Sequence, residues 1–356
     1  MPQPDARSSL SPATSGLRAD AATPGGFRAA RWLSNPHVQT LLPRVLRPAE
    51  VDWRQEFLDL PDGDEVELSW VLPEPDDQSA PLFVLFHGLE GGITSPYAHD
   101  LLAAARDQGY RALLMHFRGC GSRPNRLPRA YHSGDTGDAR VLLKVLGDRY
   151  PEAPKVAGGV SLGGNMLLRL VAEEDADSLG LDAAVVISAP LDLAACAQRL
   201  GEGFSRVYER HLLASLKRKV IPRLERGELS LKVSVEQVRR LKRLRDYDDV
   251  ITAPMHGFLD ADDYYARASS GPVLDRVAVP TLMLHARDDP FMPADLIERF
   301  PARSPLVTLE VAERGGHVGF MEPGPRRPRP WLGRRLARYL QELSLTPDSA
   351  VMQDCP

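Results

Sequence analysis

The sequence predicts an α/β fold, in which a doubly wound, mostly parallel sheet carries a helical cap insertion. From about residue 52, short apolar segments typical of buried strands alternate with amphipathic helical segments. The alternation stops near Pro190, and residues 193–270 contain no clear strand pattern. It resumes at about residue 279, so one core interrupted by an insertion explains the chain better than two sequential domains do.

The composition is that of a globular protein with a sizeable core. The chain has 356 residues, of which 43% are hydrophobic and 26% are charged. Its formal net charge of −4 argues against a general nucleic-acid-binding protein, because such proteins usually carry a large basic excess. Three widely spaced cysteines form no C-x-x-C pair, which excludes a disulfide scaffold and a thiolate zinc site.

The amino-terminal residues 1–26 predict a disordered tail, because they are rich in Pro, Ser, Ala and Gly. They lack the apolar core of a secretory signal. No apolar run in the chain approaches the roughly 18 residues that are needed to span a bilayer. We therefore expect no transmembrane segment and a cytoplasmic location.

The first half of the core follows the alternation of strands and helices. A turn at 61–64 precedes the alternating apolar and polar residues 65–72, which indicates a β-hairpin. Residues 81–87 form a near-continuous apolar run, as expected for a strand that is covered on both faces. After that strand we expect helices at 97–108, 135–149 and 164–174, and strands at 111–117, 155–160 and 183–188.

The second half of the core follows the insertion. We expect strands at 279–286 and 306–311, helices at 294–300 and 331–343, and an irregular connector at 322–330. The predicted organisation is therefore a core made of residues 27–189 and 271–345, with residues 190–270 forming a helical cap.

The cap departs from the acidic character of the whole chain. Residues 206–245 contain 13 Lys and Arg side chains against 4 Glu side chains. A charge run of this kind is most often the solvent-facing side of helices. The alternative is that the basic cap makes peripheral contact with an anionic membrane or guides an acidic lipid. The sequence leaves this choice, and the oligomeric state, open.

A candidate nucleophile lies where a predicted strand meets a predicted helix. Residues 159–163 match G-x-S-x-G, with Ser161 at the centre. At such a strand-to-helix turn the serine backbone is strained and its hydroxyl is exposed. Glycines flank the serine because strand and helix pass too closely for side chains. The pentapeptide alone is only suggestive, but its position favours a nucleophilic serine over an ordinary serine in a glycine-rich turn.

A nucleophilic serine needs a base and a carboxylate. Among nine histidines, His317 lies in a glycine-rich loop after the predicted last strand. Asp288 and Asp289 follow the preceding strand, where a carboxylate would orient the imidazole and stabilise the imidazolium. We favour Asp289, because D-x-x-x-P fits Asp289 and Pro293, and we expect the other aspartate to cap a helix. The chain order Ser161, Asp289, His317 is that of the α/β-hydrolases.

The tetrahedral intermediate of acyl transfer needs two donors for its oxyanion. We expect the first to be the backbone N–H of Leu162, directly after the nucleophile at the start of the helix. The second should come from the glycine-rich turn at 87–92, and we choose the N–H of Leu89. The alternative is that this turn only reverses the chain.

Other chemistries find little support in the sequence. It contains no P-loop, no G-x-G-x-x-G and no H-E-x-x-H motif. No Cys/His cluster has the spacing of a metal site. We therefore expect no cofactor and no metal, and a small-molecule acyl ester as the substrate.

Several motifs resemble those of the YheT-like α/β-hydrolases, the bacterial branch of a group that includes eukaryotic abhydrolase-domain lipases and medium-chain ester synthase/esterases. The resemblance covers about residues 32–343. The N-P-H-x-Q-T element at 35–40 and the H-G-F block at 256–258 are distinctive, whereas G-x-S-x-G is shared across the fold. Further matching blocks lie at 87–92, 116–122, 132–138, 247–255, 263–265 and 286–293.

The resemblance implies a serine esterase or lipase that acts on acyl esters with Ser161, Asp289 and His317 as its triad. One departure is the Gly158-Gly159 pair before the serine, where a single glycine is expected. Our leading hypothesis is a carboxylic ester hydrolase that cleaves short- to medium-chain acyl esters through an acyl-enzyme. An acyltransferase that passes the acyl group to an alcohol would use the same residues. A non-catalytic binding protein on the same fold is the third hypothesis.

Overall fold

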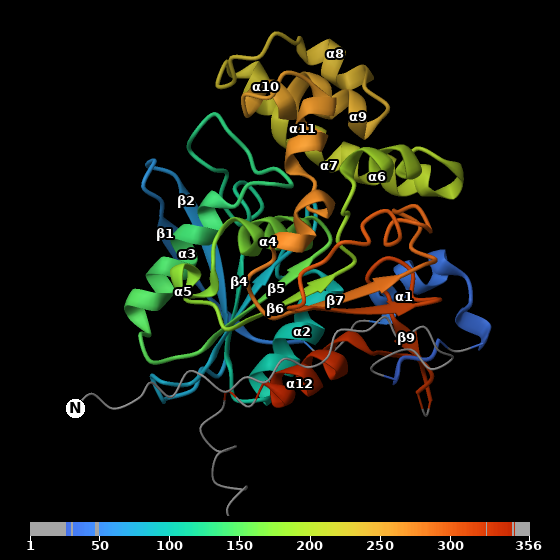
Figure 1. Cartoon of the computed structure of the whole chain (residues 1–356). Coiled ribbons are helices and arrows are strands. Elements are labelled where there is room, and N and C mark those ends of the chain that lie inside the picture. Colours follow the sequence, from blue (N-terminus) through green and yellow to red (C-terminus); the bar gives the residue numbers. More distant parts are fainter. Residues whose placement is uncertain (1–25, 30, 47–49, 325, 344, 346–356) are drawn as a thin grey trace, which may run out of the picture.

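The computed structural model describes residues 26–29, 31–46, 50–324, 326–343 and 345 (Figure 1). All of the predicted tail except Gly26 lies outside these residues. An eight-stranded sheet forms the centre of the fold, in the order β1-β2-β4-β3-β5-β6-β7-β8. Its strands are β1 (Trp53–Asp59), β2 (Glu65–Val71), β3 (Leu82–Phe86), β4 (Arg111–Met115), β5 (Lys155–Val160), β6 (Ala183–Ile187), β7 (Thr281–Ala286) and β8 (Val307–Ala312).

The sheet is parallel except at one edge. Strands β1 and β2 form the predicted hairpin, and β2 also pairs antiparallel with β4. Every other neighbouring pair in this sheet is parallel. The doubly wound, mostly parallel sheet predicted from the sequence is therefore confirmed. In such a sheet the carboxyl ends of the parallel strands lie at one edge, where ligands commonly bind.

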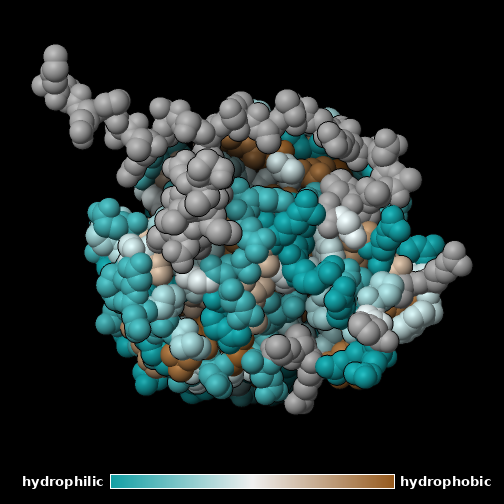
Figure 2. Space-filling model, turned by 90° about the horizontal axis from the view of Figure 1, so that it is seen from below, coloured by the Kyte–Doolittle hydropathy of each residue, from teal (hydrophilic) through white to brown (hydrophobic). Residues whose placement is uncertain are grey.

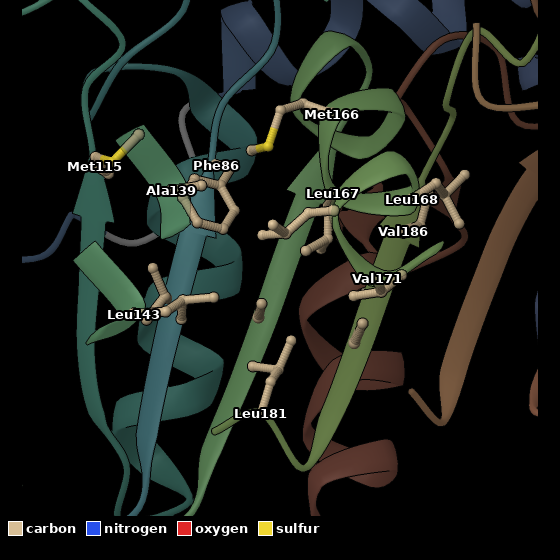
Figure 3. Close-up of a cluster of buried hydrophobic side chains, with 14 of the residues drawn as sticks. Phe86, Met115, Ala139, Leu143, Met166, Leu167, Leu168, Val171, Leu181 and Val186 are labelled. Atoms are coloured by element: carbon tan, nitrogen blue, oxygen red, sulfur yellow. The ribbon is translucent and has the colours of Figure 1, made fainter. Parts of the chain in front are cut away.

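Helices cover both faces of the sheet. One face packs against α3 (Gly137–Arg149) and α4 (Leu162–Glu173), and the other packs against α2 (Pro96–Asp107) and α12 (Leu332–Glu342). The short helix α5 (Ala176–Leu179) follows α4. Strands β3 to β7 contain only buried residues, which explains their near-continuous apolar sequences. Figure 3 shows Met166, Leu167 and Val171 of α4 in the cluster that also contains Phe86 and Val186.

A helical segment separates β6 from β7 and lies above the sheet in Figure 1. Its elements are α6 (Leu193–Leu200), η3 (Gly203–Ser205), α7 (Arg206–Glu225), α8 (Val235–Arg240), α9 (Leu244–Tyr247), the π-helical turn η4 (Asp248–Thr252), α10 (Ala253–Met255) and α11 (Ala261–Ala268). The 3-10 turn η5 (Gly271–Arg276) leads back to the sheet. Tyr208, Leu213, Val238 and Ile251 belong to a hydrophobic cluster inside this segment, separate from the clusters of the sheet.

Two short elements precede the sheet, η2 (Arg31–Leu33) and the helix α1 (Pro36–Leu46). Helix α1 lies against the strand β9 (Met321–Glu322), because the buried Gln39 bonds to the backbone of Met321. Strand β9 pairs with β10 (Arg329–Pro330), so the connector that we expected to be irregular contains a two-stranded ribbon.

The helix expected at 294–300 is wrong, because residues 294–299 form a run of turns. The backbone N–H groups of Leu296 and Phe300 bond at three-residue spacing, to Pro293 O and Ile297 O. A single bond, from Arg299 N to Asp295 O, has the four-residue spacing of an α-helix. Leu296 and Ile297 are buried in the core cluster. Packing of these two side chains overrides the local helical tendency of the segment.

The surface opposite the cap is predominantly hydrophilic, with hydrophobic residues scattered between polar ones (Figure 2). Within the described ranges, no helix is long and apolar enough to cross a membrane.

Candidate active site

Ser161 lies at the sharp turn between β5 and α4. Its backbone has φ 54° and ψ −118°, a conformation that is costly for a residue with a side chain. Hydrogen bonds from Ser161 N to Ile187 O (2.8 Å) and from Asn165 N to Ser161 O (3.0 Å) hold it there. A Cβ atom on Gly163 would lie 2.4 Å from Phe86 O, so the backbone approach itself requires the glycine. The turn therefore has the backbone geometry of a nucleophile elbow, with Ser161 at its tip.

The imidazole of His317 lies between Ser161 and Asp289. Its Nε2 is 3.0 Å from Ser161 Oγ, and its Nδ1 is 2.8 Å from Asp289 Oδ2. His317 comes from the loop after β8, and Asp289 from the turn after β7. An ionised carboxylate only accepts hydrogen bonds, so Nδ1 carries the proton and Nε2 is left to accept from the serine hydroxyl. The structure thus brings together three side chains that lie up to 156 positions apart in the sequence.

Two further contacts hold this row of side chains. Asp289 is 3% exposed, and its Oδ1 accepts a hydrogen bond of 2.8 Å from the N–H of Phe291. The ring of Phe291 stacks on the imidazole of His317, with centroids 3.9 Å apart and planes 8° apart. Burial and stacking leave the imidazole and the carboxylate little freedom to rotate out of line.

Asp288, the alternative acid, faces another way. Its Oδ1 accepts hydrogen bonds from the N–H groups of Gly315 (2.8 Å) and Gly316 (2.9 Å). Burial raises the pKa of Asp288 above its usual value. We expected the second aspartate to cap a helix, and this is wrong, because no helix follows and its carboxylate braces the loop that carries His317.

Leu89 and Leu162, the residues of the two predicted oxyanion donors, line the same cavity as Ser161. Leu162 is the first residue of α4, where backbone N–H groups have no acceptor within the helix. On either side of Leu89, the N–H of Gly88 bonds to Tyr97 Oη and the N–H of Glu90 bonds to Tyr131 Oη, each at 2.8 Å. The two tyrosines fix the amides that flank Leu89.

His87 and His116 have structural partners. Nδ1 of His87 donates to Gly88 O at 2.7 Å, its Nε2 accepts from the N–H of Phe117, and burial lowers its pKa to about 3. His116 bonds to Ser69 Oγ and to the carbonyl of Cys120. Among the described histidines, only His317 bonds to Ser161. In the same part of the chain, no group of three or more His, Cys, Asp or Glu side chains is placed to hold a metal ion.

The candidate triad opens on a cavity of about 660 Å³ between the sheet and the cap segment. Apolar side chains dominate the wall that lies on the cap side, among them Leu193, Ala197, Leu200, Leu212 and Leu244. The volume lies within the range that is usual for small-molecule sites.

Glu90 links the turn after β3 to the cap. Its Oε2 accepts a hydrogen bond from Ser215 Oγ (2.7 Å), and its Oε1 accepts from Lys219 Nζ (2.8 Å) and Tyr131 Oη (2.9 Å). Ser215 and Lys219 belong to α7, so this cluster ties the cap to the turn that carries Leu89.

Comparison with known proteins shows the family to which this chain belongs. The family model described as alpha/beta hydrolase fold matches residues 81–323. YheT of Escherichia coli (strain K12) is 45% identical over 316 residues, which cover 88% of this chain and 92% of YheT. The chain belongs to the YheT-like α/β-hydrolases.

The more distant relatives of this hydrolase include a phospholipase and a lipase. Human Phospholipase ABHD3 is 28% identical over 88% of this chain and 78% of its own length. Monoacylglycerol lipase of Saccharomyces cerevisiae is 28% identical over 74% of this chain and 60% of its own. The solved structure of Pyrococcus furiosus esterase Pf2001 has a TM-score of 0.53 at 15% identity, covers 89% of this chain and 97% of its own, and shows the same fold.

Two residues of this hydrolase that sequence reasoning did not assign to the site are Gln39 and Thr40. Thr40 Oγ1 accepts a hydrogen bond from the N–H of His317 (2.9 Å) and donates to Pro36 O (2.8 Å). The fully buried Gln39 side chain accepts from the N–H of Met321 (2.7 Å) and donates to its carbonyl (3.1 Å). These contacts hold the loop that carries His317 in place at its start and at its end. The N-P-H-x-Q-T element, which contains both residues, was the signal that could have found them.

Proposed function

We propose that this protein hydrolyses carboxylic esters through an acyl-enzyme formed on Ser161. The observation that carries the proposal is the unbroken hydrogen-bonded row from Ser161 Oγ through the His317 ring to Asp289, at the wall of a largely apolar cavity. Membership of an esterase- and lipase-like family supports the same reaction class.

The reaction begins when Ser161 Oγ attacks the ester carbonyl carbon and its proton moves to Nε2 of His317. Asp289 stabilises the imidazolium through the hydrogen bond from Nδ1. The N–H groups of Leu162 and Leu89 bind the oxyanion of the tetrahedral intermediate. When this intermediate collapses, Nε2 returns the proton to the departing alkoxide, and the alcohol leaves while the acyl group stays on Ser161.

Hydrolysis repeats these steps with water as the nucleophile. His317 takes a proton from water as the hydroxyl attacks the acyl carbon, and it then gives that proton to Ser161 Oγ. The products are a carboxylic acid and the free enzyme. No step needs a metal or an organic cofactor.

We expect the cavity to bind the acyl chain of the substrate beside Ser161, and its properties favour a short- to medium-chain acyl group. Its size suits a small molecule, and the side chains of Leu193, Leu200 and Leu244 offer an apolar surface for an acyl chain. In this proposal residues 190–270 act as a cap that keeps water away from the acyl-enzyme.

Hydrolysis of p-nitrophenyl esters from acetate to palmitate tests the proposal, with Ser161→Ala as the blank. We expect serine-dependent release of p-nitrophenol with an optimum below palmitate. A fluorophosphonate should label the parent protein and not Ser161→Ala. Equal hydrolysis by parent and Ser161→Ala would refute the proposal, as would a parent protein that takes no label. Ester formation at rising alcohol concentration would show acyl transfer instead of simple hydrolysis.

A further inference from the structure

Large hydrophobic side chains that face solvent gather at one place on the protein. Nine of them are exposed in the described residues, and six belong to two neighbouring segments. These six form what we call the mouth surface: Trp32, Val38, Leu41 and Val45 of the η2–α1 segment, Phe204 of η3 and Val207 at the start of α7. The exposed fraction is 68% for Trp32 and 76% for Val45.

Ring contacts bring the two segments together. The imidazole of His37 in α1 packs on the ring of Phe204, with centroids 4.5 Å apart. Its Nδ1 lies 3.2 Å from Tyr208 Oη in α7. The two segments that carry the six hydrophobic residues therefore lie against each other, although about 160 positions of sequence separate them. Figure 1 shows α1 at the edge of the core, below α6 and α7.

The cavity that contains Ser161 opens within this neighbourhood. Most residues that line the cavity are at least partly buried, and the exposed ones mark its opening. The exposed lining residues are Leu41 and Arg44 of α1, Thr94 of the turn after β3, and Val207 and His211 of α7. Leu41 and Val207 thus belong both to the opening and to the mouth surface.

Three arginines lie at the opening or beside residues that line it: Arg44 is a lining residue, and Arg206 and Arg210 precede the lining residues Val207 and His211. Arg44, Arg206 and Arg210 are exposed, and none of them forms an ion pair with another described residue. Some cap arginines are paired, as in Arg239 with Glu225 and Arg240 with Glu236, whereas Arg218 is exposed and has no ion pair with another described residue. Unpaired positive charge is therefore present at the mouth surface as well as elsewhere on the cap.

We propose that the mouth surface docks on an anionic lipid surface and delivers ester lipids from it to the cavity. This inference rests on the proposed ester hydrolysis for the use of the docked lipid, but docking itself does not need catalysis. Apolar side chains gain free energy by entering the boundary between headgroups and acyl chains, and arginines pair with headgroup phosphates. A tryptophan suits this boundary because one end of its ring system is apolar and the other carries a polar N–H.

Binding to vesicles tests docking apart from catalysis. The full chain with Ser161→Ala is floated with vesicles of phosphatidylcholine, or of phosphatidylcholine and phosphatidylglycerol in equal parts. We expect clear binding to the mixed vesicles and much weaker binding to phosphatidylcholine alone. Adding Val45→Asp or Phe204→Asp should lower the affinity by roughly fivefold or more, as expected for losing the burial of one large apolar side chain. Adding Arg206→Gln with Arg210→Gln should remove most of the preference for anionic vesicles.

A matched control is Leu259→Asp, because Leu259 is 90% exposed on the cap but lies outside the mouth surface. Its affinity should equal that of the parent. Trp32 gives an independent signal, because Trp70 and Trp331 are buried and the exposed Trp53 lies in β1, outside the mouth surface. The tryptophan emission should shift to the blue on the mixed vesicles, and Trp32→Phe should lose that shift. A thermal melt of each variant confirms that these surface changes leave the fold intact.

The outcomes separate the two proposals. Serine-dependent ester hydrolysis without vesicle binding would overturn the docking proposal alone. Vesicle binding by a parent protein that takes no fluorophosphonate would overturn the proposed reaction alone. If Val45→Asp and Phe204→Asp instead convert a dimer into a monomer in sedimentation, without changing vesicle binding, the surface joins two copies of the chain and the lipid proposal is wrong.

Discussion

Replacing Thr40 with valine removes the hydroxyl group that accepts a hydrogen bond from the N–H of His317 and donates one to Pro36 O. Valine has nearly the same shape as threonine, so the wall of the cavity keeps its form. The N–H of His317 loses the acceptor that lies 2.9 Å away, at a half-buried position. We expect slower acylation of Ser161, because the imidazole depends on this backbone for its distance of 3.0 Å to the serine hydroxyl.

The size of the effect follows from the contacts that remain. Leaving a buried donor without a partner costs about 1–3 kcal/mol. Asp288 still holds Gly315 and Gly316, and Gln39 still holds Met321, so the loop cannot move far. We therefore expect about 1.4 kcal/mol, which is about a tenfold fall in the rate of acylation.

The assay is the second-order rate of fluorophosphonate labelling, measured across pH beside a thermal melt. Thr40→Ser is the matched control, because it keeps the hydroxyl and should label nearly as fast as the parent. The kcat for a p-nitrophenyl ester should fall with the labelling rate, while KM changes little. If Thr40→Val labels as fast as the parent, or if Thr40→Ser is as slow as Thr40→Val, the bracing role of the Thr40 hydroxyl is wrong.

Three further predictions concern the acid, a buried carboxyl group and the elbow. Asp289→Asn should lower kcat by about a thousandfold with little loss of stability. Asp288→Asn should lower kcat by only about tenfold, but it should also lower the melting temperature. If Asp288→Asn lowers kcat more than Asp289→Asn does, Asp288 is the triad acid. Burial raises the pKa of Asp248 to about 6, so the folded protein holds this proton more tightly than the unfolded chain does. Stability should therefore fall by about 2 kcal/mol as pH rises from about 4 to about 6, and urea unfolding of Asp248→Asn should show a smaller fall; an unchanged pH profile would contradict this. Gly163→Ala should lower the unfolding free energy by at least about 3 kcal/mol, or the variant should fail to accumulate as soluble protein. The reason is that the added Cβ meets the carbonyl oxygen of Phe86. An unfolding free energy within about 0.5 kcal/mol of the parent value would show that the elbow has room for the methyl group.

Local patterns in the sequence were enough to predict the sheet and the elbow. Strands β3 to β7 are buried throughout, so each appears in the sequence as an apolar run. The elbow depends on steric contacts between β5, α4 and the neighbouring strand, which only glycine can satisfy around Ser161. The order of serine, aspartate and histidine along the chain then predicted side chains that the fold places within hydrogen-bond distance. Their catalytic role stays a prediction.

Local patterns failed where distant segments decide the structure. Residues 294–300 look helical in the sequence, but burial of Leu296 and Ile297 holds them in turns. Nothing near Asp288 shows that its carboxylate binds two amides of the histidine loop, 27 and 28 positions away. The stacking of Phe291 on His317 likewise depends on two loops that meet only in the folded protein.

The sequence by itself determined the class of fold, the elbow and the chemical identity of the candidate nucleophile, base and acid. These depend on short-range periodicity and on sterics within one strand, turn and helix. Only the tertiary structure decided which aspartate faces the imidazole, how Gln39 and Thr40 hold its loop, and where the cavity opens. Each of these depends on contacts between segments that are far apart along the chain, because such contacts form only when the whole sheet and its cap are in place.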